Sequence, residues 1–78
     1  MVYCRLISHN NGIAIYAIGA VVSDITGLMR LNCNNRKYLV MQKPHKEEVY
    51  DLFIDKMIKK YQKEFDKGDI PEKMSYEI

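Results

Sequence analysis

The segment after Pro44 carries the strongest structural signal in the chain, the pattern of one amphipathic helix. Pro44 suits the first turn of a helix, because its missing N–H needs no partner there. Acidic residues lie early in the segment and lysines lie late, an order that complements the helix dipole. Gly68 suits the position just after a helix end, and Pro71 prevents a restart. The pattern therefore predicts a helix near 45–67.

The apolar residues of this segment gather on one side of the predicted helix. At about 100° per residue, the apolar half of the cylinder holds Val49, Tyr50, Phe53, Ile54, Met57, Ile58, Tyr61 and Phe65. The other half holds Glu48, Asp51, Leu52, Asp55, Lys56, Lys59, Lys63 and Asp66. Leu52 is the one apolar residue on that polar half. We expect Phe53, Met57 and Tyr61 to pack against a sheet.

The chain before Pro44 has the character of β-strands, which we expect near 2–8, 13–22, 27–33 and 37–42. The run from Ile13 to Val22 is apolar on both alternating faces, which fits either a strand covered on both sides or a buried helix. Its β-branched residues and the turn before it favour a strand. Gly19 within this run indicates a bulge or a bend.

Polar turns separate these predicted strands. The turn at 9–12 ends in Asn11 and Gly12, which accept a left-handed backbone. In the turn at 23–27, Asp24 is expected to bind backbone N–H groups, and Gly27 to take a positive φ.

The register between the last two predicted strands depends on the loop around Asn34 and Asn35. A three-residue loop places Met29 opposite Met41, whereas a two-residue loop places Met29 opposite Val40. Both registers are physically reasonable.

Together these elements predict one α+β domain over 1–78, with an antiparallel four-stranded sheet in ββββα order packed on one C-terminal amphipathic helix. We divide it into a strand-rich half at 1–43, a helix at 44–68 and a tail at 69–78. Met74, Tyr76 and Ile78 alternate along the tail. The tail is therefore either a short fifth strand or a frayed end, and so many apolar residues favour an ordered tail.

Composition restricts the function classes without selecting one. The net charge of +2 predicts neither a nucleic-acid partner nor a membrane partner by itself. No stretch of the sequence is apolar over the length of a membrane span, and the first residues lack the features of a secretory signal. We expect a cytoplasmic protein in which Cys4 and Cys33 are buried, reduced and free of metal.

No motif for catalysis, cofactor binding or metal binding is evident. Asp24-Ile25-Thr26-Gly27 differs from the aspartic-protease signature by one intervening residue, and there is only one such loop. His9 and His45 have no Cys or His at ligand spacing. We therefore expect no catalytic, cofactor-binding or metal-binding residues and no cofactor.

Lysines and tyrosines supply the candidate binding residues. A row of lysines in the last turns of the predicted helix could follow a phosphate backbone, but acidic residues lie among them and no arginine accompanies them. Tyrosines on the outer face of a sheet could anchor a partner. The candidate binding surface comprises Leu52, Lys56, Lys59, Lys63, Tyr16 and Tyr38.

Two stretches of the chain carry a resemblance to other proteins. These are the Asp24-x-Thr26-Gly27 turn followed by an alternating strand, and the run from Gly68 to Met74 after a helix rich in Tyr and Lys. Over about the last two-thirds of its length, the chain resembles short proteins of low-GC Gram-positive bacteria that have no assigned activity. The resemblance implies no catalytic residues.

These observations favour a small non-catalytic binding or regulatory protein that acts on a protein partner, a second copy of the chain included. An inhibitor of a host protein, encoded by a phage or a mobile element, is an alternative of the same class. A nucleic-acid-binding module that uses the lysine face of the helix is a second alternative. We also expect self-association, because one helix covers only one face of a sheet.

Overall fold

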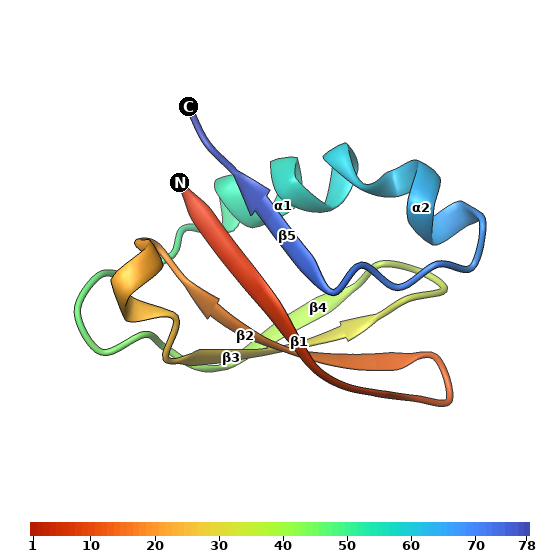
Figure 1. Ribbon diagram of the computed structural model, residues 1–78, viewed down its shortest axis with the longest axis horizontal. Coiled ribbons are helices and arrows are strands. Elements are labelled where there is room, and N and C mark those ends of the chain that lie inside the picture. The colour runs from red at the N-terminus through yellow and green to blue at the C-terminus, as the bar shows by residue number, and fades with distance from the viewer.

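The computed structural model describes residues 1–78 and shows an antiparallel five-stranded sheet with helices on one face (Figure 1). The elements in chain order are β1 (Val2–Asn10), β2 (Ile13–Gly19), the 3-10 turn η1 (Val22–Asp24), β3 (Gly27–Asn32), β4 (Tyr38–Gln42), α1 (Asp51–Lys60), α2 (Gln62–Asp66) and β5 (Lys73–Tyr76). The strands lie side by side in the order β4-β3-β2-β1-β5. The α+β class and the antiparallel sheet are confirmed.

The tail forms a fifth strand, so the prediction of four strands and a C-terminal helix is wrong in this detail. β5 pairs antiparallel with β1, placing Met74 opposite Cys4 and Tyr76 opposite Val2. Met74 is 2% exposed, and it packs in the same core as Cys4. The tail is thus ordered by the apolar alternation seen in the sequence. The chain ends consequently lie near each other, as Figure 1 shows.

The helix begins later than its apolar pattern predicts, at Asp51 instead of near residue 45. The hydroxyl of Thr26 accepts the His45 N–H at 2.9 Å. The carboxylate of Asp24 accepts the N–H groups of Lys46 at 2.7 Å and Glu47 at 3.3 Å. These side chains hold the segment in a bent conformation, since its backbone donors are already bound outside any helix.

The helix also divides near its C-terminal end. Tyr61, with φ −99° and ψ 14°, separates α1 from α2. Phe65 of α2 is nonetheless buried in the common core, which keeps both helices on one face of the sheet.

Gly19 and Gly27 are required because another backbone segment passes too close for a side chain, and not for the reasons predicted from the sequence. Gly19 ends β2 without a bulge, and a Cβ there would lie 2.2 Å from the carbonyl oxygen of Asp24. Gly27 does not have a positive φ, and a Cβ there would lie 2.7 Å from the Gln42 carbonyl oxygen. The register is irregular instead in β1, between Leu6 and Ser8, and in the β3–β4 pair, where Leu28 lies opposite Gln42 and Met29 opposite Val40, leaving Met41 unpaired.

The second of the two registers considered for β3 and β4 is the correct one. Met29 lies opposite Val40, as expected for the shorter loop. The connection is nevertheless longer than two residues, and Arg36 within it takes a left-handed φ of 61°. The side-chain oxygen of Asn32 stabilises this turn by accepting the N–H of Asn34 at 2.9 Å.

The hydrophobic core lies between the helices and one face of the sheet. It contains Val2, Cys4, Ala14, Tyr16, Ile18, Met29, Leu31, Cys33, Ile54, Met57, Ile58, Phe65 and Met74. Met57 is fully buried, whereas Phe53 and Tyr61 are only partly buried at the margin of the core. The opposite face, which we call the outer face, carries no α-helix. No helix in the protein combines the length and the apolar character that crossing a membrane requires.

Candidate functional site

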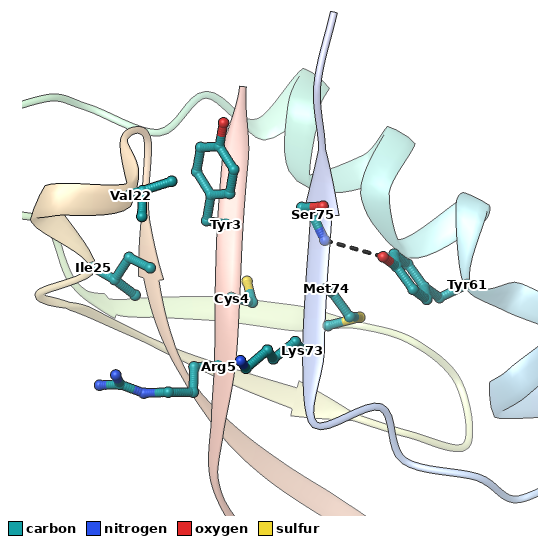
Figure 2. A pocket seen from close by; sticks show the side chains of 9 residues that line it. All are labelled: Tyr3, Cys4, Arg5, Val22, Ile25, Tyr61, Lys73, Met74 and Ser75. Atoms are coloured by element: carbon teal, nitrogen blue, oxygen red, sulfur yellow. Dashed lines mark hydrogen bonds between the residues drawn. The ribbon is translucent and has the colours of Figure 1, made fainter.

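The largest hollow of the protein, which we call the β1–β5 hollow, has a volume of about 410 Å³ (Figure 2). Its lining residues are Tyr3, Cys4, Arg5, Val22, Ile25, Tyr61, Lys73, Met74 and Ser75. β1 and β5 form its floor. Figure 2 shows Val22 and Ile25 on the side of β1, and Tyr61 on the side of β5.

Strand alternation decides which side chains reach this hollow. Cys4 and Met74 point into the core, so Tyr3, Arg5 and Lys73 stand on the outer face. Most of the lining is apolar, and its charged groups are the guanidinium of Arg5 and the ammonium of Lys73. In Figure 2 both lie at the end of the hollow away from Tyr3.

Arg5 and Lys73 form a like-charged pair across the β1–β5 ladder. They are direct Cα partners in the antiparallel register. Directly opposed side chains have Cβ atoms about 4.5–5.5 Å apart, and like charges at this separation are destabilising. The ion pairs of the protein join Arg36 to Asp66 and Lys43 to Glu48. Neither Arg5 nor Lys73 has a carboxylate to compensate the repulsion.

The opposite end of the hollow has a different electrostatic character. Partial desolvation of the ring and the nearby carboxylate of Glu77 raise the pKa of Tyr3. The two cationic groups therefore lie at one end of the hollow, and the carboxylate of Glu77, which does not itself line the hollow, lies near Tyr3 at the other.

The outer edge of β5 is closed by side chains of the helical segment. The hydroxyl of Tyr61 accepts the Ser75 N–H at 3.3 Å, drawn as a dashed line in Figure 2. The ammonium of Lys60 donates to the Ser75 carbonyl at 3.0 Å. A further strand would have to displace both groups before it could pair with β5.

The edge of β4 is the other end of the sheet, and no strand pairs with its outer side. The segment Tyr38–Gln42 carries no charge. Two of its apolar side chains are exposed, Leu39 at 61% and Met41 at 47%. We call these two side chains and the free backbone of β4 the β4 surface.

The structure does not gather the predicted binding residues into one surface. Tyr16 is completely buried in the core, so its assignment to a binding surface is wrong. Tyr38 is half-buried, and its hydroxyl donates to the carboxylate of Asp51 at 3.1 Å. Burial and this carboxylate raise the pKa of Tyr38. Both tyrosines therefore serve the packing of the fold.

The helical candidates remain on the surface, but they are not equivalent. Leu52 is 59% exposed on the polar side of α1, as its position predicts. Lys56 lies over the ring of Tyr76, with its nitrogen 5.9 Å from the ring centroid. Lys59 and Lys63 are exposed and form no ion pair.

Asp24 is a structural carboxylate. It is 2% exposed and accepts hydrogen bonds from the Thr26 hydroxyl at 2.8 Å and from backbone N–H groups of the 43–50 segment. Burial acts to raise the pKa of Asp24, but the bonds from Lys46, Thr26 and Glu47, together with nearby His45, leave it lowered. The prediction that Asp24 binds backbone N–H groups is confirmed.

The two thiols are buried and unbonded to each other. Burial raises the pKa of Cys4 to about 12, and burial also raises the pKa of Cys33. No group of three or more His, Cys, Asp and Glu side chains is arranged to hold a metal ion.

The β1–β5 hollow and the β4 surface were not found from the sequence. Alternation along 2–8 does place Arg5 on the face opposite Val2 and Cys4. The pairing of Arg5 with Lys73 depends on the position of β5 beside β1. No local pattern in the sequence predicts that position.

Comparison of the chain with protein families, with curated proteins and with solved structures finds no match.

Proposed function

We propose that this protein is a small non-catalytic binding protein of the cytoplasm that acts through protein–protein contact at the β4 surface. The observation that carries the proposal is the asymmetry of the two sheet edges. Ser75 of β5 is bonded to side chains of the helical segment, whereas β4 has no partner on its outer side. An extended segment of a partner would gain main-chain hydrogen bonds along β4. Leu39 and Met41 would add apolar contact beside it.

The charges around β4 favour a particular partner chemistry. Lys37 and Lys43 flank the uncharged strand at its two ends. Lysines beside an edge strand oppose indiscriminate pairing. A partner segment with an apolar centre and carboxylates at its ends complements this pattern. An inhibitor that blocks a host protein would use the same edge.

A second copy of the chain is the simplest partner to examine. Antiparallel pairing of two β4 strands about a two-fold axis brings identical surfaces together. The uncharged Tyr38–Gln42 segment avoids like charges at the centre of such a pair. Lys37 of one copy would approach Lys43 of the other copy at each end of the pair, so the contact should be weak.

The chemistry of the buried groups supports the non-catalytic part of the proposal. A thiol with a pKa of about 12, such as Cys4, holds almost no thiolate at neutral pH. Asp24 already accepts hydrogen bonds from the turn that it supports. The free thiols also suit the cytoplasm, where reducing systems keep cysteines unpaired.

The arrangement of the helical lysines favours protein contact over nucleic-acid binding. Lys56 lies over Tyr76, and Lys60 donates to Ser75. Two lysines of the row therefore stabilise β5. Lys59, Lys63 and Lys67 are left without such contacts, and acidic residues such as Glu64 lie among them.

Sedimentation equilibrium over a roughly hundredfold concentration range tests the self-association form of this proposal. We expect a reversible monomer–dimer equilibrium that Leu39→Glu shifts to monomer. Leu52→Glu is the matched control, since Leu39 and Leu52 are 61% and 59% exposed. Arg30, the cross-strand neighbour of Leu39, compensates the new carboxylate, so the variant should fold.

The two variants distinguish the two exposed apolar surfaces. Loss of association in Leu52→Glu alone would place the interface on α1 and contradict the assignment to β4. A monomer at every concentration would overturn the self-association form.

A further inference from the structure

The β1–β5 hollow is separate from the β4 surface, because β1 and β5 lie at the opposite end of the sheet from β4. Its volume of about 410 Å³ lies within the range of small-molecule sites. The closed edge of β5 makes the hollow unsuited to an added strand. The volume of the hollow and the closed edge of β5 both favour a compact ligand on the outer face over an added strand.

The charge arrangement specifies the ligand further. Arg5 and Lys73 are opposed across the ladder without a carboxylate partner, and none of the residues lining the hollow is acidic. An anion between them would replace a repulsion with two charge-assisted hydrogen bonds. A guanidinium donates to both oxygens of a carboxylate, and an ammonium adds a point charge.

The walls specify the rest of the ligand. Val22 is 70% exposed, and it stands with Ile25 on one side of the hollow (Figure 2). The ring of Tyr3 lies beside Val22 and beyond Ile25, away from the cationic end (Figure 2). An aliphatic or aromatic body reaching from Arg5 towards Tyr3 would cover this apolar surface.

We infer that the β1–β5 hollow binds a small organic carboxylate with an apolar body. Its carboxylate lies between Arg5 and Lys73, and its body lies along Val22, Ile25 and Tyr3. This inference does not rest on the protein-binding role of β4.

Titration of the whole chain with octanoate, followed by two-dimensional amide NMR, tests the inference. We expect saturable shifts in β1, β5 and the residues around Val22 and Ile25. Octanol and octylammonium keep the apolar chain but lack the negative charge, and acetate keeps the carboxylate but lacks the chain. Each of these probes should bind at least about tenfold more weakly than octanoate.

Matched variants then locate the charge requirement. Arg5→Gln and Lys73→Gln should each weaken octanoate binding by about tenfold or more. Arg30→Gln removes another exposed arginine of the outer face, and Lys59→Gln removes an exposed lysine of the helix. These two controls should leave the affinity unchanged.

A second measurement shows that the variants are folded. Because Arg5 and Lys73 repel each other, neither Arg5→Gln nor Lys73→Gln should lower the melting temperature of the free protein. Octanoate should raise the melting temperature of the unaltered protein and of the two controls, but not that of Arg5→Gln or Lys73→Gln.

Several outcomes would overturn the inference. Equal binding of octanol and octanoate would show that the charges play no part, and shifts outside β1, β5 and the Val22–Ile25 segment would move the site. An unchanged affinity of Arg5→Gln for octanoate would show that Arg5 does not bind the carboxylate. Tighter binding of an apolar tripeptide through its C-terminal carboxylate would assign the hollow to protein C-termini instead.

Discussion

The hydroxyl of Tyr16 donates a 2.7 Å hydrogen bond to the carbonyl of Pro71, which lies 55 residues later in the chain. Tyr16 is fully buried in the middle strand of the sheet, and Pro71 lies just before β5. The bond therefore ties the centre of the core to the segment that leads into the edge strand. Burial raises the pKa of Tyr16, so the phenol remains a donor at neutral pH.

Replacement of Tyr16 by Phe should lower the free energy of unfolding by about 1–2 kcal/mol, because the Pro71 carbonyl loses its donor. The ring still fills its place in the core. Denaturant titration measures this change, and hydrogen exchange should show faster exchange in β5 than in β2 or β3. Uniform loss of protection in every strand would contradict a local link between Tyr16 and β5.

The helix face can be checked at Met57, which is fully buried. Met57→Ala should lower the free energy of unfolding by about 2–5 kcal/mol, since the lost contacts leave a cavity. Lys59→Ala on the exposed side should change it by less than about 0.5 kcal/mol. Phe53→Ala should fall between them, because Phe53 is only partly buried beside Tyr76. Equal effects of Met57→Ala and Lys59→Ala would show that the helix faces the other way.

Asp24 should give the protein a specific sensitivity to acid. Its pKa is lowered in the folded state, so its contribution is fully present above the unfolded value of about 3.9. This contribution is lost as the pH falls below that value and through the folded pKa. Unfolding measured across this acidic range should therefore show stability decreasing as the pH falls.

Asp24→Asn is the control for this pH dependence. The amide does not ionise, and its single oxygen cannot serve all the donors bound by the carboxylate. The variant should be less stable than the unaltered protein at neutral pH, and its stability should depend less on pH below about 3.9. An identical pH dependence in both proteins would assign the acid sensitivity to other groups.

The features of the fold that could be predicted from the sequence are those set by local patterns. Alternation and turn residues located the first four strands, and the helical period identified Ile54, Met57, Ile58 and Phe65 as the face that packs on the sheet. The core side of the helix is a local property, because the spacing of apolar residues sets it directly.

The incorrect predictions have a common cause, because each depends on contacts between residues that are distant in the sequence. The segment after Pro44 is suited to a helix, but Thr26 and Asp24 bind its N–H groups. β5 forms because the free edge of β1 is available to it. Tyr16 resembled a surface candidate because nothing local indicates which face of β2 the helix covers. The like-charged pair of Arg5 and Lys73 also depends on the pairing of β1 with β5. The candidate ligand site could therefore not be predicted from the sequence.

The two cysteines provide a probe of global unfolding. Cys4 is 3% exposed and Cys33 is 8% exposed, and burial raises the pKa of both thiols, that of Cys4 to about 12. The thiolate is the form that attacks a thiol reagent, so both cysteines should react far more slowly in the folded protein than in denaturant. Cys4 belongs to β1, which lies between β2 and β5 in the sheet. Modification of Cys4 should therefore require β5 to detach from β1.

Tyr16→Phe connects this prediction to the opening of β5. If β5 detaches locally before the protein unfolds, the variant should react faster at Cys4 than its global stability explains, while Cys33, in the turn after β3, should follow global stability. Mass spectrometry after timed labelling separates the two sites. Rapid labelling of Cys4 in the unaltered folded protein, or an intact mass lower by two hydrogens, would contradict the reduced and buried state of these thiols.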